Sequence, residues 1–193
     1  MAILKSLRKW LALLACCAVS VSCGDAESLY SSFYAYFSYT PVNSKPTLYR
    51  ACTSLGEFCS ITFPVGSKKY VIQSPSTPSE TDYIDRTSDQ GYRNFRLGLG
   101  TGLIIGLPSI PEMMATESTV VCYDLCCPSC YQNEHVQKGL TLSTRGTASC
   151  SMCQRVYDLN AQGIITSGEA GRALYRYYVS YSPTTFSLTV NNR

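Results

Sequence analysis

The segment VCYDLCCPSCYQNEHVQKGLTLSTRGTASCSMCQRVYDLNAQGIITSGEAGRALYRY, residues 121–177, contains two Cys-x-x-Cys pairs about twenty residues apart: Cys127 with Cys130, and Cys150 with Cys153. A tight turn that carries two thiolates points both sulfurs at one ion. Two such turns supply the four ligands of a closed metal or cluster site. Pro128 stiffens the first turn. This spacing predicts a four-cysteine site formed by two facing turns.

The surrounding residues predict strands in a repeated arrangement. Tyr123-Asp124-Leu125 precedes the first pair, and Tyr157-Asp158-Leu159 follows the second within a predicted strand at 155–159. A turn at 160–163, Ser167-Gly168 and a strand at 174–177 come next. We interpret Asp124 and Asp158 as turn-capping or strand-pairing carboxylates. The repetition indicates two similar strand–turn units that face each other across the site.

This order resembles the second half of a Rieske domain and is similar to that of Rieske-like bacterial lipoproteins. The resemblance covers the last third of the chain well and residues 48–106 loosely. It implies an all-β, Rieske-like fold of antiparallel strands with a small metal-binding subdomain at about 121–177. It also implies a [2Fe-2S] cluster, electron transfer and a redox protein partner.

The ligands depart from the Rieske pattern, in which two of the four are histidines. The corresponding positions hold Ser129 or Cys130 in the first turn and Cys153 in the second. The single histidine, His135, lies outside both turns in a polar stretch, where an exposed position is expected. A four-cysteine site on a Rieske-like scaffold remains.

Three states of this site stay open, with Cys127, Cys130, Cys150 and Cys153 as the groups in each. Four thiolates suit a zinc ion or another soft divalent ion. They also suit a [2Fe-2S] cluster. Without metal, an exported protein tends to oxidise such pairs to disulfides.

The first 22 residues predict a secretory signal peptide. Three basic residues precede an apolar run at 10–21, which is shorter than the ~20 residues that span a bilayer. Ser22-Cys23-Gly24 resembles a lipoprotein processing site, with Cys23 as the lipidated residue; Cys16 is the competing position, and an ordinary cleaved signal is the other alternative. We expect an exported protein, lipid-anchored to the outer membrane on its periplasmic or cell-surface face.

The charge balance excludes a polyanion partner. The formal charge of +3 comes from Lys5, Arg8 and Lys9, so the remainder has thirteen basic and thirteen acidic residues. We therefore expect no nucleic acid partner. Residues 97–106 contain several glycines but lack a phosphate-binding fingerprint, so we expect close backbone packing there and no nucleotide.

Residues 23–40 are expected to form a lipidated N-terminus with a first strand at 33–39, although a helical stripe is possible there. Residues 41–193 form one domain by length. Tyr-, Thr- and Val-rich segments predict strands at 48–52, 58–63, 70–72 and 119–125. The polar segment 74–91 predicts a long loop, as does 108–117. We expect the tyrosines mostly to pack in the core.

The spare cysteines leave several pairings open. Cys52 and Cys59 flank a possible turn and are candidates for a disulfide or for buried thiols; Cys122 and Cys126 lie near the first pair. Because Cys126 adjoins Cys127, the first ligand is ambiguous by one position. No catalytic constellation is recognisable, so an enzyme is not favoured. Two functions stay open: an electron carrier, and a non-redox binding module in which the cysteines form a structural zinc site or disulfides.

Overall fold

A computed structural model describes residues 29–88, 91–92, 94–112 and 115–192. The predicted signal peptide and Cys23 lie outside the described residues. Within them, the chain forms antiparallel sheets and only two short α-helices, which confirms the all-β prediction. No helix in the described ranges is long and apolar enough to cross a membrane.

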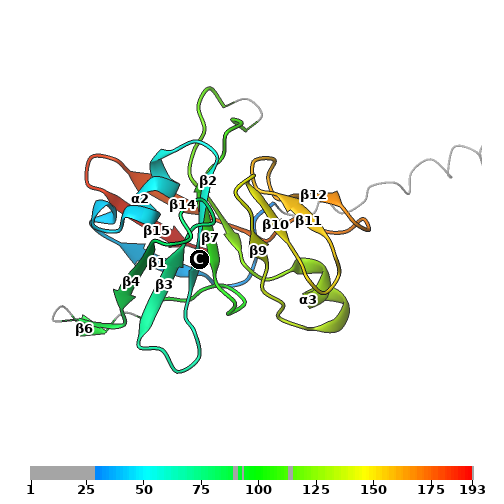
Figure 1. Cartoon of the computed structure of the whole chain (residues 1–193), viewed down its shortest axis with the longest axis horizontal. Coiled ribbons are helices and arrows are strands. Elements are labelled where there is room, and N and C mark those ends of the chain that lie inside the picture. Colours follow the sequence, from blue (N-terminus) through cyan, green and yellow to red (C-terminus); the bar gives the residue numbers. More distant parts are fainter. Residues whose placement is uncertain (1–28, 89–90, 93, 113–114, 193) are drawn as a thin grey trace, which may run out of the picture.

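The largest sheet has six antiparallel strands (Figure 1). Their spatial order is β13 (Arg176–Tyr177), β8 (Val121–Asp124), β7 (Leu103–Leu107), β2 (Glu57–Thr62), β3 (Lys69–Gln73) and β4 (Thr81–Asp85). Its central strands are buried on both faces. On β7, Leu103 and Ile105 pack in one core cluster and Ile104 in another, because successive side chains of a strand point to opposite faces.

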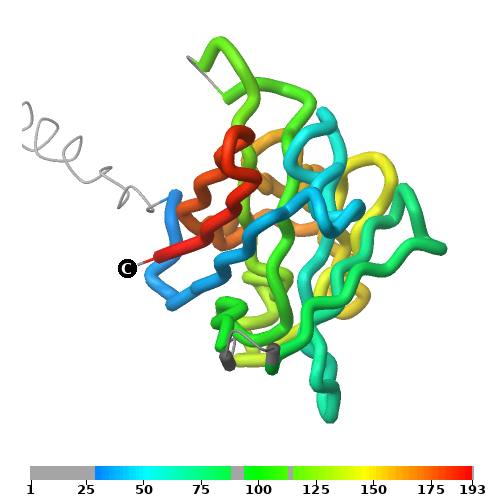
Figure 2. Tube along the Cα trace, turned by 90° about the vertical axis from the view of Figure 1, so that its left-hand side faces the viewer, coloured from blue at the N-terminus to red at the C-terminus, as the bar shows by residue number. Residues whose placement is uncertain are grey.

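The first core lies between this sheet and a three-stranded sheet, β1 (Tyr36–Tyr39), β15 (Ser187–Asn191) and β14 (Val179–Ser182). β1 confirms the strand predicted at 33–39 in its second half, and none of these residues is helical. It pairs with β15, so the first and last strands described lie side by side (Figure 2). The helix α2 (Pro46–Thr53), preceded by a 3-10 turn η1 (Val42–Ser44), packs against the six-stranded sheet.

The second core joins the other face of the six-stranded sheet to a separate lobe. This cysteine lobe consists of α3 (Pro128–Glu134) and a four-stranded sheet, which appear together at the right of Figure 1. The strand order there is β12 (Ile164–Ser167), β11 (Val156–Asp158), β10 (Thr147–Ser149) and β9 (Thr141–Leu142). The Tyr123 and Tyr157 side chains are fully buried in this core. The packing role expected for the tyrosines holds only for part of them, since others are exposed, namely Tyr34, Tyr36, Tyr49, Tyr83 and Tyr178.

The strand prediction for 48–52 is wrong. These residues belong to α2, whose first residue, Pro46, already has the backbone angle of a helix. Leu48, Ala51 and Cys52 are buried on one helical face, since residues three and four apart share a face.

The loop prediction for 74–91 is also wrong in part. This segment contains β4 and β5 (Thr87–Ser88), which pairs with β6 (Gly91–Tyr92). Ile84 is the buried apolar side chain of β4. Because β4 is an edge strand, polar residues are tolerated along it, and the sequence alternation is correspondingly weak.

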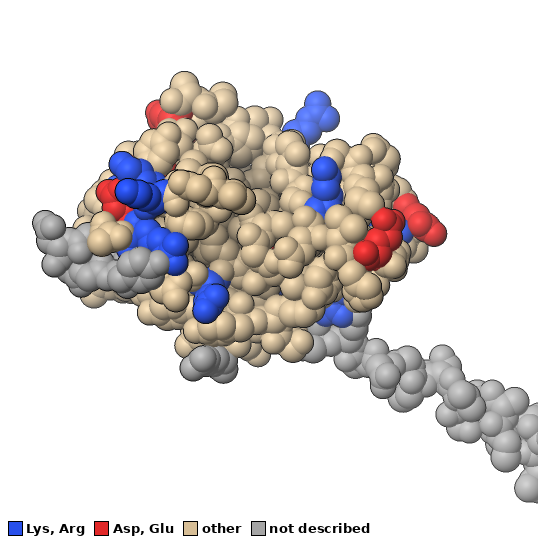
Figure 3. Space-filling view, turned by 90° about the horizontal axis from the view of Figure 1, so that it is seen from below, with Lys and Arg blue, Asp and Glu red and all other residues tan. Residues whose placement is uncertain are grey.

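The Gly-rich segment 97–106 packs its backbone closely, as predicted. A side chain at Gly106 would overlap the ring of Phe58, its cross-strand neighbour. Basic and acidic side chains share the face seen in Figure 3, and wide areas of it carry neither charge.

Candidate metal centre

The four predicted ligands converge in the cysteine lobe. Cys127 ends the segment after β8, Cys130 lies one turn into α3, and Cys150 and Cys153 lie in the turn after β10. Cys127 Sγ lies 3.5 Å from Cys153 Sγ, and Cys130 Sγ lies 3.6 Å from Cys150 Sγ. All four sulfurs are within 4.8 Å of one another. The group is therefore compact enough to hold a metal ion.

The first pair is held by the start of a helix, where a simple turn was expected. Pro128 occupies the first helical position, and the Tyr131 N–H donates to the Cys127 carbonyl at 3.1 Å. Because Cys127 and Cys130 are three positions apart, both sulfurs face the same side of the helix. The Cys127 N–H donates to the Lys138 carbonyl at 2.8 Å, which ties this helix to the chain that returns toward β9.

The second pair lies in a tight turn closed at both ends. The Gln154 N–H donates to the Cys150 carbonyl at 3.0 Å, and the Cys150 N–H donates to the Arg155 carbonyl at 2.9 Å. Gln154 has a positive φ of 59°, a left-handed conformation that reverses the chain. The turn thereby directs Cys150 and Cys153 toward α3.

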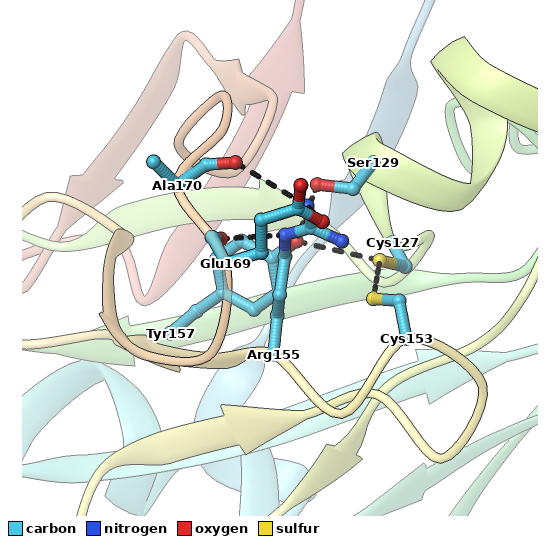
Figure 4. Close-up of polar contacts among 7 residues, drawn as sticks. All are labelled: Cys127, Ser129, Cys153, Arg155, Tyr157, Glu169 and Ala170. Carbon is cyan, nitrogen blue, oxygen red and sulfur yellow. Dashed lines mark hydrogen bonds and ion pairs between the residues drawn. The ribbon is translucent and has the colours of Figure 1, made fainter.

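Tyr157 and Ser129 add polar contacts beside the sulfurs (Figure 4). The Tyr157 hydroxyl lies 3.3 Å from Cys127 Sγ and 3.3 Å from Ser129 Oγ. Burial raises the pKa of Tyr157, and its contact with Cys127 raises it further. The hydroxyl is therefore protonated at neutral pH and can donate to a thiolate.

Arg155 places a cation beside the second pair. Its side chain donates to the Glu169 carbonyl at 2.8 Å, the Glu169 carboxylate at 2.9 Å and the Ala170 carbonyl at 3.3 Å (Figure 4). Burial alone would raise the pKa of Cys153, but backbone and side-chain hydrogen bonds from Arg155 lower it to about 7. Positive charge beside the thiolates offsets their mutual repulsion.

The pKa values of the Cys127 and Cys130 thiols are raised, which favours their neutral form. Burial raises the pKa of Cys127 despite the opposing hydrogen bond from Tyr157. Burial, followed by contacts with the neighbouring thiols, raises the pKa of Cys130. A metal ion must displace protons from such groups, so its binding is coupled to pH.

The buried Asp124 carboxylate holds the backbone that leads from β8 to Cys127. Its carboxylate accepts hydrogen bonds from the Cys126 N–H at 2.7 Å, the Leu99 N–H at 2.8 Å and the Tyr177 hydroxyl at 2.6 Å. Burial raises the pKa of Asp124, although these hydrogen bonds oppose the shift. Asp158 makes a simpler turn contact, accepting from the Asn160 N–H at 2.9 Å. Both carboxylates thus cap turns, as predicted.

The remaining cysteines stay apart from the group. Cys126 packs with Leu99 and Tyr175 in a small third cluster, so the ambiguity between neighbours is resolved in favour of Cys127. Cys52, Cys59 and Cys122 are buried in the first core. All eight cysteines in the described ranges are free thiols. His135 is exposed and ends α3 in a left-handed conformation with φ 55°.

Sequence reasoning missed Arg155, Tyr157 and Ser129 as neighbours of the sulfurs. Arg155 lies two residues after Cys153, and that proximity was the available signal. Neither the protein-family models nor the curated proteins yield a match to this chain. The Rieske-like resemblance therefore stays a prediction.

Proposed function

We propose that this chain is an exported, lipid-anchored binding module whose cysteine lobe is held together by one structural zinc ion. The observation that carries the proposal is the spacing of the four sulfurs. The Sγ–Sγ distance is 3.5 Å between Cys127 and Cys153 and 3.6 Å between Cys130 and Cys150. No two of the four sulfurs are more than 4.8 Å apart. Four sulfurs at the usual zinc–sulfur distance lie about 3.8 Å apart at the corners of a tetrahedron.

The same spacing argues against a [2Fe-2S] cluster. Such a cluster binds two thiolates on each of two irons, so sulfurs on different irons lie about 5.5 Å or more apart. The sulfurs of Cys127, Cys130, Cys150 and Cys153 are closer than that in every combination. A single four-coordinate ion fits them better.

The burial of the ligands supports a structural role. Cys127, Cys130 and Cys150 are at most 2% exposed and belong to the second core cluster. Four protein ligands close the coordination sphere of zinc, whereas catalytic zinc keeps one position open for water or substrate. A bound zinc ion would neutralise the charge of the thiolates and would cross-link α3 to the turn between β10 and β11.

The proposal of a lipid anchor rests only on the sequence of the predicted signal peptide and of Cys23. The basic residues, the apolar run and Cys23 support export and lipidation. Five residues separate Cys23 from Leu29, where the described part of the chain begins. An outer-membrane anchor at Cys23 would therefore keep the domain within a short tether of the membrane surface, on the periplasmic or cell-surface face.

A second candidate function is electron transfer. Cys153 is the partly exposed member of the group, and both Arg155 and Tyr157 contact sulfurs. Hydrogen bonds to sulfur tune reduction potentials. Iron bound by the same four thiolates could exchange one electron with a redox partner docked over Cys153. The Rieske-like resemblance supports this candidate.

Metal analysis tests the two functions. Residues 24–193 are produced anaerobically, and zinc, iron and acid-labile sulfide are measured together with the absorbance spectrum. We expect one zinc per chain and no visible band. Cys127→Ser and Cys153→Ser should lose the metal, whereas Cys126→Ser, at the adjacent buried thiol, should retain it. Two irons with two sulfides, or one iron with a reducible band, would replace the zinc proposal by the electron carrier.

A second experiment tests the anchor. Cells that express the full chain are fractionated, and the membrane-bound protein is analysed by mass spectrometry. We expect a lipid adduct on Cys23 and release of the protein from the membrane on Cys23→Ser substitution. Recovery of an unmodified, soluble chain would reject the anchor while leaving the metal result untouched.

A further inference from the structure

A second candidate site lies along the edge of the three-stranded sheet. A cleft of about 720 Å³ is lined by residues 117–120 on one side and by 177–181, which lead into and along β14, on the other. None of the four metal-centre cysteines lines it. Figure 2 shows the loop before β8 in green beside the β14–β15 hairpin in red. The volume lies in the range of ligand-binding clefts, roughly 300–1,000 Å³.

The β14 edge along this cleft is unpaired. In its sheet, β14 pairs with β15 and with no other described strand. The Asn191 N–H donates to the Tyr178 carbonyl, and Ser180 lies opposite Thr189 in the register. Hydrogen-bonded positions alternate along an antiparallel strand, so the N–H and C=O groups of Val179 and Tyr181 point away from β15. These groups are available to an added strand.

Buried polar side chains converge on the same cleft. The Arg176 side chain is only 5% exposed and forms an ion pair with Glu112. Arg176 Nε, Ser118 Oγ and Tyr181 Oη are buried and find no hydrogen-bond partner in the part of the chain that the structure describes. Unpaired buried polar groups are costly, and the residues that carry these three all line the cleft. A ligand that draws these side chains into the cleft would relieve that cost.

We propose that this cleft binds an extended peptide with a basic side chain, which adds as a strand to the free edge of β14. A peptide backbone presents N–H and C=O groups at the spacing that Val179 and Tyr181 require, and its carbonyls can accept from Arg176. Glu112 offsets the charge of Arg176, while Glu117 is exposed on the same wall. The excess negative charge favours a lysine or arginine on the peptide. This assignment goes beyond the proposed metal-centre role and is independent of it.

The first test selects ligands and removes one outward donor. A random heptapeptide library displayed on phage is selected on the full chain in detergent micelles, and enriched peptides are synthesised for fluorescence anisotropy. Val179→Pro deletes an N–H that points away from β15 and keeps the β14–β15 ladder, as proline on an edge strand permits. We expect about tenfold weaker binding by Val179→Pro, with an unchanged metal content that reports an intact fold.

A matched pair of variants tests the contribution of the Glu117 charge to peptide binding. Glu117→Gln should weaken binding of a basic peptide about threefold at low salt, and the difference should shrink as ionic strength rises. Glu134→Gln, at an exposed carboxylate on α3 away from the cleft, should leave the affinity unchanged.

A second test distinguishes strand addition from binding through side chains alone. Each backbone nitrogen of the best peptide is methylated in turn. Strand addition predicts an alternating pattern, in which methylation at every second residue weakens binding about tenfold or more and methylation between them has little effect. The proposal is overturned if no peptide is enriched over selection on Val179→Pro, if Val179→Pro binds like the unmodified chain, or if methylation shows no alternation.

Discussion

Replacement of Asp124 by asparagine should destabilise the fold more than its small chemical change suggests. The Asp124 carboxylate accepts hydrogen bonds on both oxygens. Oδ2 accepts from the Leu99 N–H and the Tyr177 hydroxyl, and Oδ1 accepts from the Cys126 N–H and, at 3.4 Å, the Thr101 hydroxyl. The side chain is fully buried. An asparagine has one oxygen to offer to these donors.

The size of the stability loss in Asp124→Asn depends on which hydrogen-bond donors can reorient. The hydroxyls can rotate to accept from the asparagine amide, but the backbone N–H groups of Leu99 and Cys126 cannot. Either orientation of the amide therefore leaves one buried backbone N–H facing another donor. An unsatisfied buried donor and the loss of charge-assisted hydrogen bonds together cost about 2–4 kcal/mol.

Asp158→Asn provides the matched control, because it changes the same residue in the second Tyr-Asp-Leu repeat. Asp158 is half-buried, and the one described hydrogen bond of its side chain, from the Asn160 N–H, uses Oδ1. An asparagine oxygen can replace it, so we expect a cost of less than about 1 kcal/mol.

Urea denaturation of the metal-loaded protein, followed by circular dichroism, measures both variants. With a slope of about 2 kcal/mol per molar urea, Asp124→Asn should lower the midpoint by about 1–2 M and Asp158→Asn by less than about 0.5 M. Metal content is measured alongside, since Asp124 caps the turn that leads to the first cysteine pair. Equal midpoint shifts for the two variants would refute the argument from fixed donors.

Tyr157→Phe removes the hydroxyl beside Cys127 Sγ and should weaken metal affinity about tenfold in a competition assay with a chelator dye; Tyr123→Phe, whose hydroxyl donates to a backbone carbonyl, should leave that affinity unchanged. Gly98→Ala should cost about 3 kcal/mol or more in free energy of unfolding, because the glycine has φ +59° and a methyl group would overlap a buried carboxylate. Gly66→Ala has a similar φ of +77° in open space and should cost about 1 kcal/mol. Removal of metal by a chelator or by acid should abolish hydrogen-exchange protection in the cysteine lobe first and in the six-stranded sheet only later. Simultaneous loss of protection in both would contradict the division into two separate core clusters.

Several elements were predictable because their signals are local. The β-rich composition of 58–63 and 119–125 indicates strands, and β2 and β8 form there. The helix at 46–53 was missed although Leu48, Ala51 and Cys52 have helical spacing, since eight residues give a weak periodic signal. The edge strand β4 was missed because an exposed edge does not require an apolar face.

By itself, the sequence determined the number and type of the candidate ligands and the all-β class, because Cys-x-x-Cys spacing and strand composition act over a few residues. Only the tertiary structure decided that Cys127, and not its neighbour Cys126, joins the group, because one position along the chain reverses the direction of a side chain. It alone placed Arg155 and Tyr157 against the sulfurs and left the edge of β14 open beside Arg176. Tyr157 and Cys127 are 30 positions apart, and residues 117–120 meet β14 from a distant part of the chain. Local patterns carry no information about which distant surfaces meet, and even Arg155, close to Cys153 in sequence, is directed toward it only by the fold of the turn.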